Sequence, residues 1–186
     1  MNRSYKLEGI IIKVNEIGEI DNRLTILSNY SGLVVVLAKG IRRINSRRSP
    51  HLDLINHINC YLYKGKSFDI VTDVSPIDHF SWLKTRFSRV VYAYKLIELV
   101  NRFLVPGEEQ NDIFQRLLID LHKLNSPQFI NEAELTEDFA NFLLWQLGFL
   151  PRDKKLTGLT LDKTVEELCE RKIYSNLLIS KLQRGL

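Results

Sequence analysis

The sequence has little of what zinc sites, disulfide frameworks and redox centres need. Its 186 residues contain two cysteines, Cys60 and Cys169, which lie far apart and form no CxxC pair. Two such thiols exclude a four-cysteine zinc site, and they favour a reducing compartment over a disulfide-bonded secreted fold. We therefore expect no metal, and we expect Cys60 to be buried and unliganded because it alternates with apolar neighbours.

Motifs of catalysis are also missing. The four histidines are scattered without HExxH spacing, and no GxGxxG, GxxxxGK[ST] or GxSxG segment occurs. The acidic pair Glu166-Glu167 is followed by Glu170, a pattern typical of a solvated helix face. Because no segment combines a nucleophile, a base and an orienting group, the sequence predicts a protein that is not an enzyme. It predicts no cofactor and no small-molecule substrate.

Long hydrophobic runs are absent as well. No run approaches the roughly 20 apolar residues of a membrane span, and the N-terminus lacks the apolar core of a signal peptide. We therefore expect a cytoplasmic protein with no membrane partner. The hydrophobic content of 45% and aromatic content of 10% are those of an ordinary globular protein.

The most informative stretch that is present runs from Gly32 to Pro50, GLVVVLAKGIRRINSRRSP. Six apolar residues at 33–38 predict a strand, and the turn-forming residues after them predict a mobile loop. Arginine forks suit phosphate, and a loop can follow a nucleic-acid backbone without reading its sequence. The alternative, a basic loop that is only solvated surface, stays open. The loop carries five cations and no acid: Lys39, Arg42, Arg43, Arg47 and Arg48.

The first 80 residues alternate with a period of two. Joined by hairpins except for one long connection, five strands predict a small Greek-key barrel of the OB type. Such barrels bind single strands by stacking aromatic rings on bases. Tyr61 and Tyr63, flanked by Lys64 and Lys66, are the candidates, unless these rings cover a second buried layer. The expected strands are 5–14, 23–27, 33–38, 52–63 and 68–74.

After residue 80 the hydrophobic period becomes helical. An apolar stripe predicts one long helix over 80–104, ending before Pro106-Gly107. Further helices are expected at 111–124, from the Asn131/Glu134 capping box to Gly148, and within 165–182. With a linker expected near Ser75-Pro76, the sequence predicts an α+β protein. Its domains are an OB barrel at 1–78 and an all-helical domain at 79–186.

Several of these segments resemble the RecO family of recombination mediators and DNA repair proteins. The segment YKLEGII at 5–11 resembles the opening strand of that family, and Gly18-Glu19 with Asp21 resembles its first hairpin. Ala38-Lys39-Gly40, followed by Arg42 and Ser46-Arg47, resembles its signature loop. Less specific similarity covers its helices at 91–102, 142–149 and 171–178.

Two features depart from the family. Its members usually carry a longer stretch before the closing helix, in some with a four-cysteine zinc site. Here only about twenty residues, 150–169, occupy that place, so the helical domain is shortened and has no zinc cysteines. The family also often has basic residues entering the central helix, where this chain has Glu137 and Asp138.

The resemblance implies a bacterial, cytoplasmic, nucleoid-associated protein of DNA repair and homologous recombination. It would bind single- and double-stranded DNA, anneal complementary strands and help load recombinase onto strands coated by single-strand-binding protein. Its implied partners are RecR and the acidic C-terminal tail of single-strand-binding protein, for which Arg89, Arg102 or Arg116 are candidate cations. The residues by themselves leave two other classes open: an RNA-binding OB module, and an interaction scaffold with an incidental basic loop.

Overall fold

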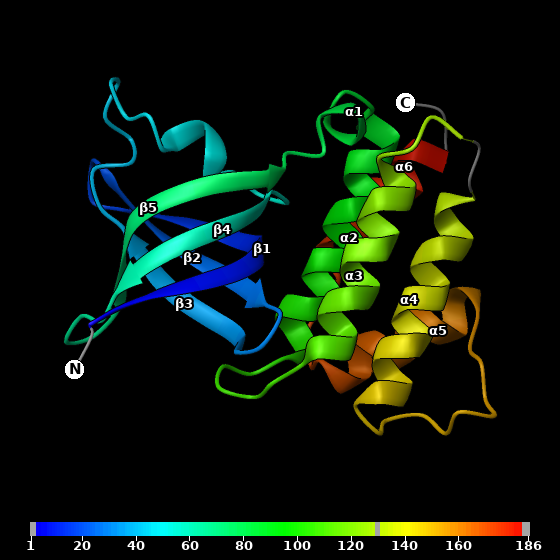
Figure 1. Ribbon diagram of the computed structural model, residues 1–186. Helices are drawn as coiled ribbons and strands as arrows, with labels where there is room; N and C mark the ends of the chain where they lie inside the picture. The colour runs from blue at the N-terminus through cyan, green and yellow to red at the C-terminus, as the bar shows by residue number, and fades with distance from the viewer. Residues whose placement is uncertain (1–2, 129–130, 184–186) are drawn as a thin grey trace. The chain divides into compact units, whose positions relative to one another are not determined.

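A five-stranded barrel forms the N-terminal part of the computed structural model, which describes residues 3–128 and 131–183. The strands close in the order β1-β2-β3-β5-β4, with β3 and β5 parallel and the other pairs antiparallel (Figure 1). This is the strand order of an OB barrel, and helices follow the barrel along the chain. The predicted fold class is therefore confirmed. The strands are β1 (Ser4–Ile17), β2 (Asp21–Ser28), β3 (Gly32–Ala38), β4 (His57–Tyr63) and β5 (Asp69–Asp78).

The barrel encloses an apolar core built by alternation along each strand. In β4, Ile58, Cys60 and Leu62 are fully buried, whereas the tyrosines between and after them face solvent. The predicted burial of Cys60 is confirmed, and burial raises the pKa of its thiol to about 12. The core cluster comprises Leu7, Ile11, Leu24, Ile26, Val36, Ala38, Ile41, Leu52, Ile58, Cys60, Leu62, Val71 and Val74.

The predicted fourth strand begins too early. Residues 52–56 form a turn after a short 3-10 helix, η1 (Ser49–His51), and Ile55 has a φ of 74°. The Asn56 amide, buried in this turn, donates hydrogen bonds to the Pro50 and His51 carbonyls at 3.2 and 2.9 Å. These hydrogen bonds satisfy the buried amide and stabilise the turn. The alternation of apolar residues in the sequence does not reveal them, so it predicted a strand here.

The expected linker at Ser75-Pro76 is wrong. Both residues lie in β5 and pair with Asn59 and Ile58 of β4. Pro76, which has no N–H to donate, sits beside a register shift in this pairing, a place where strands tolerate proline. The strand therefore continues to Asp78.

The chain divides into two compact units, and the first is more than the N-terminal barrel. It runs to Phe80 and also takes in Leu104–Phe114. Pro106 bridges to Gly32, and the Phe114 ring packs edge-on against His57 at 5.9 Å between centroids. Gly32 has a φ of 59°, and a Cβ there would lie 1.7 Å from the Glu108 carbonyl oxygen, so only glycine fits. A barrel domain taken as residues 1–78 omits this segment.

The second unit is helical and includes Ser81–Phe103 and the chain from Gln115 onwards. In it α2 packs against α4 and α6. No helix among the described residues is long and apolar enough to span a membrane. The helices are α1 (Ser81–Lys84), α2 (Phe87–Phe103), α3 (Asn111–Leu124), α4 (Glu132–Gln146), α5 (Gly158–Leu168) and α6 (Tyr174–Gln183).

Two helix predictions need correction and one is confirmed. The single helix over 80–104 is broken at 85–86. Most of its expected apolar stripe is buried, Leu83, Val91 and Ile97 among it, whereas Phe87 and Tyr94 are exposed. The helix expected from residue 165 begins at Gly158 instead. The Asn131 cap is confirmed, since its side-chain oxygen accepts from the Glu134 amide at 3.2 Å. The apolar residues that α2 buries include Val91, Ala93, Leu96, Ile97, Leu99 and Val100.

Candidate nucleic-acid interface

The loop at 39–48 follows β3 and is tied to the barrel at its start. The Gly40 amide donates to the Asp21 carboxylate at 2.7 Å, and the Arg42 amide donates to the Ile20 carbonyl at 3.0 Å. Ile41 is buried between these two anchors. The first half of the loop is therefore fastened to the β1–β2 turn.

Arg48 has a structural role that its sequence context does not reveal. Its guanidinium donates to the Val71 carbonyl of β5 at 2.6 Å and to the Lys39 carbonyl at 2.9 Å. These bonds fasten the end of the loop to β5 and to the residue after β3. A guanidinium engaged in this way has fewer donors left for phosphate, so Arg48 is a poor member of the predicted phosphate-binding set.

Arg42 is paired, but less firmly than Arg48. It forms an ion pair with Glu16 at 2.9 Å, with side-chain exposures of 38% and 67%. An exposed ion pair of this kind contributes only about 0–1 kcal/mol. A phosphate can therefore replace Glu16 as the partner of Arg42 at little cost.

The three remaining loop cations, Lys39, Arg43 and Arg47, are exposed. Their side chains have no hydrogen bond or ion pair with any residue that the structure describes. Positive charge without an internal partner is available to an external anion, and its attraction extends over about a Debye length, near 10 Å at 0.1 M salt. These three side chains form the free cationic part of the loop.

Two more exposed cations, which sequence analysis did not single out, lie on the barrel wall. Lys13 of β1 and Arg23 of β2 face solvent, while Leu24 beside Arg23 is fully buried. The signal that could have found them is the alternation of each cation with apolar neighbours along a strand. A register shift between Ile11 and Lys13 weakened that signal, because Ile10, Ile11 and Ile12 are all buried.

The tyrosines predicted to stack on bases do face solvent. Tyr61 is 45% and Tyr63 is 37% exposed, so packing in a second buried layer is excluded for them. Lys64 and Lys66 in the following turn are exposed too. Tyr61, however, stands between Lys6 of β1 and Asp73 of β5, so a carboxylate lies in its own row. This face carries charge of both signs.

The first of the candidate cations for a protein partner, Arg89, is buried in the second unit. Its guanidinium donates to the carbonyls of Leu124, Ser126 and Gln128, of which the first and last are at 3.0 and 2.9 Å. It also stacks over the Trp82 ring at 4.5 Å. Arg89 therefore satisfies carbonyls at and after the end of α3, which have no partner within the helix.

Arg102 and Arg116 are also paired, and the three arginines do not gather. Arg102 bonds to Glu98 at 3.3 Å, and Arg116 bonds to the buried Asp120 at 2.7 Å. Arg116 also lies over the Phe142 ring at 5.3 Å. Arg89 and Arg102 are roughly 20 Å apart along α2, at 1.5 Å per residue. One short peptide groove cannot use all three at close range.

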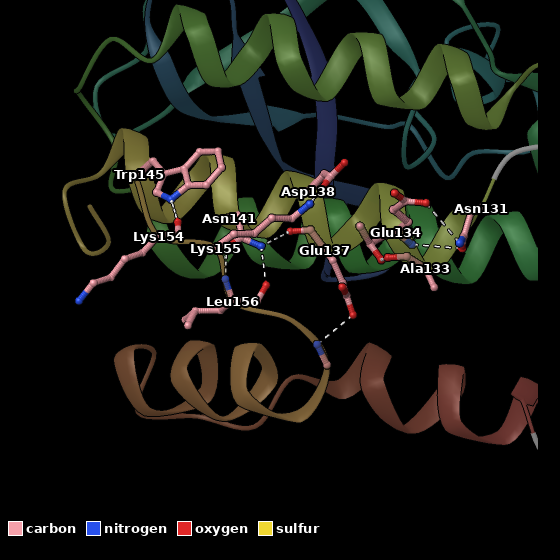
Figure 2. A network of polar contacts seen from close by, with 12 residues as sticks. Asn131, Ala133, Glu134, Glu137, Asp138, Asn141, Trp145, Lys154, Lys155 and Leu156 are labelled. Carbon is pink, nitrogen blue, oxygen red and sulfur yellow. Dashed lines mark hydrogen bonds and ion pairs between the residues drawn. The ribbon is translucent and has the colours of Figure 1, made fainter. Parts of the chain in front are cut away.

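The acidic residues of α4 hold the connection to α5 (Figure 2). The Glu137 carboxylate accepts from the Gly158 amide at 3.0 Å, and Asp138 pairs with Lys155 at 2.6 Å, which raises the Lys155 pKa. Asn141 bonds to both backbone groups of Leu156 at 2.8 Å. Glu137, Asp138 and Asn141 of α4 thus organise residues 155–158.

No three histidine, cysteine or carboxylate side chains within 3–128 and 131–183 are placed to hold a metal ion.

Comparison with known proteins identifies the barrel. The family described as Recombination protein O N terminal matches residues 1–80. The barrel is a RecO N-terminal domain. The family match therefore covers the strands, the basic loop and the tyrosine face, and it confirms the resemblance found in the sequence.

The similarity to RecO proteins extends into the helices. A DNA repair protein RecO from Roseiflexus sp. (strain RS-1) is 36% identical over 152 residues, 81% of this chain and 52% of the relative. One from Symbiobacterium thermophilum is 31% identical over 79% of this chain and 58% of the relative. One from Desulfitobacterium hafniense is 30% identical over 80% and 53%. The chain is a relative of RecO that spans about half the length of these proteins.

Proposed function

We propose that this chain is a DNA repair and recombination protein that binds nucleic acid through the basic loop of its barrel. The observation that supports this most is that Lys39, Arg43 and Arg47, in the loop after β3 of an OB barrel, are exposed and have no partner among the described residues. Similarity to proteins named DNA repair protein RecO makes DNA the expected ligand.

Annealing of complementary strands follows physically from such a site. Arginine and lysine contacts to phosphates neutralise the repulsion between two strands, and they leave the base edges unread and free to pair. The same contacts do not distinguish single from double strands. We therefore propose binding to both forms, strand annealing, and help in loading recombinase onto strands coated by single-strand-binding protein.

Protein partners belong to the same proposal. RecR is expected from the family resemblance. For the acidic tail of single-strand-binding protein, Arg102 and Arg116 are the better candidate cations, because Arg89 is buried and engaged by carbonyls. Titration of a labelled tail peptide tests this part, and the absence of saturable binding below about millimolar concentration contradicts it.

The salt dependence of binding tests the loop directly. Four available cations, Lys39, Arg42, Arg43 and Arg47, should contribute a slope of about −2.8 in log K against log salt for a single strand. Arg42→Ala/Arg43→Ala should flatten the slope by about 1.4. The matched control is Arg152→Ala/Lys154→Ala, which removes two exposed cations and the same net charge from the second unit.

The outcomes separate the proposal from its alternatives. An unchanged slope in the loop variant, or an equal change in the control, means that the loop is only solvated surface. No binding to any nucleic acid at low salt favours an interaction scaffold. Tighter binding to matched RNA than to DNA, together with no annealing of complementary DNA, favours an RNA-binding module.

A further inference from the structure

Two histidines that are 28 positions apart in the sequence meet beside the barrel. His51 ends η1, and His79 directly follows β5. The His51 Nδ1 and His79 Nε2 atoms are 3.0 Å apart, and the rings stack with their centroids 5.2 Å apart and their planes at 29°. Both side chains are half-buried, so solvent reaches them. The nucleic-acid contacts proposed above use neither histidine.

Hydrogen bonds hold the backbone around both rings. The Asn56 amide donates to the His51 carbonyl at 2.9 Å, and the His51 amide donates to the Arg48 carbonyl at 3.1 Å. Around His79, the Asp78 carboxylate accepts from the Phe80 amide at 2.7 Å, and the Phe80 side chain is fully buried. The fold therefore brings the two rings together without help from a ligand.

The protons of this pair are free to rearrange. As a hydrogen bond, the contact needs one ring N–H as donor and one bare ring nitrogen as acceptor. The two outer nitrogens, His51 Nε2 and His79 Nδ1, have no hydrogen-bond partner in the described ranges. Nothing in these ranges therefore prevents both rings from carrying their proton on the outer nitrogen. Both facing nitrogens are then bare, which is the form of imidazole that binds a metal ion.

The spacing of the facing nitrogens suits one kind of metal ion. With metal–nitrogen bonds of about 2.0–2.1 Å, a separation of 3.0 Å corresponds to an angle of about 91–97° at the ion. Angles near 90° belong to the tetragonal sites of Cu²⁺ and Ni²⁺ rather than to the tetrahedral sites of Zn²⁺. Within 3–128 and 131–183, no third histidine, cysteine or carboxylate completes a metal-binding group with this pair.

We propose that His51 and His79 form a two-histidine site for a divalent ion of the Cu²⁺ and Ni²⁺ class. Each ring turns toward an ion that lies to one side of the line between the two nitrogens, and water fills the remaining positions. The bound ion ties the end of η1 to the end of β5. This site is independent of the proposed function, because its ligands are not among the loop cations.

Calorimetric titration of Ni²⁺ into the full chain, carrying no affinity tag, tests the site. Ni²⁺ is the probe because, unlike Cu²⁺, it does not oxidise the free thiol of Cys169. Losing a group that only supports a ligand typically lowers metal affinity by about 10–100-fold, so His51→Ala and His79→Ala should each lower it at least about 10-fold. His122→Ala, which removes an exposed histidine of α3, should leave it unchanged.

Two further measurements distinguish a shared ion from two separate ones. The double variant His51→Ala/His79→Ala should bind Ni²⁺ no more weakly than either single variant, because one imidazole alone cannot chelate. Ni²⁺ should raise the thermal midpoint of the wild-type chain, since it binds the native geometry, and should not raise that of the variants. If an alanine variant fails to fold, His79→Gln keeps a hydrogen-bonding side chain, which is a poor Ni²⁺ ligand, and should show the same loss of affinity.

The outcomes decide for or against the site. Absence of saturable Ni²⁺ binding to the wild-type chain overturns it, as does wild-type affinity in His51→Ala or His79→Ala. An equal loss in His122→Ala, or a double variant that loses twice as many ions as each single variant, also overturns it. Loss of one ion in both single variants, with no change in His122→Ala, supports it.

Discussion

Arginine has opposite uses in the barrel loop and in the helical unit. In the helical unit Arg89, Arg102 and Arg116 are each held by carbonyls or carboxylates and each lie over an aromatic ring. In the loop Arg43 and Arg47 have no such partner among the described residues. Arginine therefore stabilises the fold in the helical unit, whereas in the loop its charge is available to a ligand.

Local composition and helix geometry account for this difference. The two helical pairs join residues four apart, Glu98 with Arg102 and Arg116 with Asp120, a spacing that places both side chains on one helix face. The loop contains no acid within its ten residues and has no regular geometry that would bring one close. A count of positive charge is therefore a poor guide to binding until the partners of each cation are known.

The largest expected effect is the loss of stability in Arg89→Met. This change leaves three carbonyls, of Leu124, Ser126 and Gln128, without their donor. Only the bond to the Leu124 carbonyl is fully buried, and the other two are part-buried. At about 1–3 kcal/mol for an unsatisfied buried group, and less for the other two, the free energy of unfolding should fall by about 2–4 kcal/mol. Urea unfolding of the full chain measures it.

The matched control for this variant is Arg86→Met. Arg86 also lies over the Trp82 ring, at 5.2 Å, but it is exposed. Its removal should cost less than about 0.5 kcal/mol. Equal losses for the two variants would show that the ring contact, and not the carbonyl bonds, gives Arg89 its role.

A smaller effect on stability should distinguish Arg48 from Arg47 within the loop. Arg48→Ala removes the bonds to the Val71 and Lys39 carbonyls and should lower the free energy of unfolding by about 1–2 kcal/mol. Arg47→Ala should change it by less than about 0.5 kcal/mol and should instead flatten the salt slope of DNA binding by about 0.7. A larger loss in the free energy of unfolding for Arg47→Ala than for Arg48→Ala would contradict this distinction between bonded and available arginines.

The smallest effect concerns the carboxylate that pairs with Arg102. Burial alone would raise the pKa of Glu98, but hydrogen bonds from the Ser175 and Tyr174 amides and from Arg102 outweigh it and lower the pKa. Glu98→Gln weakens this cap of α6 and should cost about 1 kcal/mol at neutral pH, as for a lost helix N-cap.

The sign of its pH dependence follows from the lowered pKa. Stabilisation by ionised Glu98 is fully present above the unfolded pKa, near 4.3, and is lost as the pH falls through the lower pKa of the folded state. The difference in unfolding midpoint between wild type and Glu98→Gln should therefore shrink in acid below about pH 4. A difference that stays constant down to pH 3 would show that the charge of Glu98 plays no part.

Much of this fold could be predicted from local patterns. Alternation predicted the strand around Cys60, a run of apolar residues predicted the strand around Val36, and the Asn131/Glu134 spacing predicted the start of α4. The exposed tyrosines and all three free loop cations, Lys39, Arg43 and Arg47, were also among the predicted residues. These features depend on neighbours within a few residues, and the sequence displays such neighbours directly.

Other features were decided only by the tertiary structure. Leu104–Phe114 belongs with the barrel because Pro106 meets Gly32 across more than seventy positions of the chain. Arg48 differs from Arg47 because its guanidinium reaches carbonyls that a different strand brings near it. Glu98 caps a helix that begins 76 residues later. These partners are brought together by hydrogen bonds and packing between segments that are distant in the sequence. Local sequence patterns do not show which distant residues will come into contact.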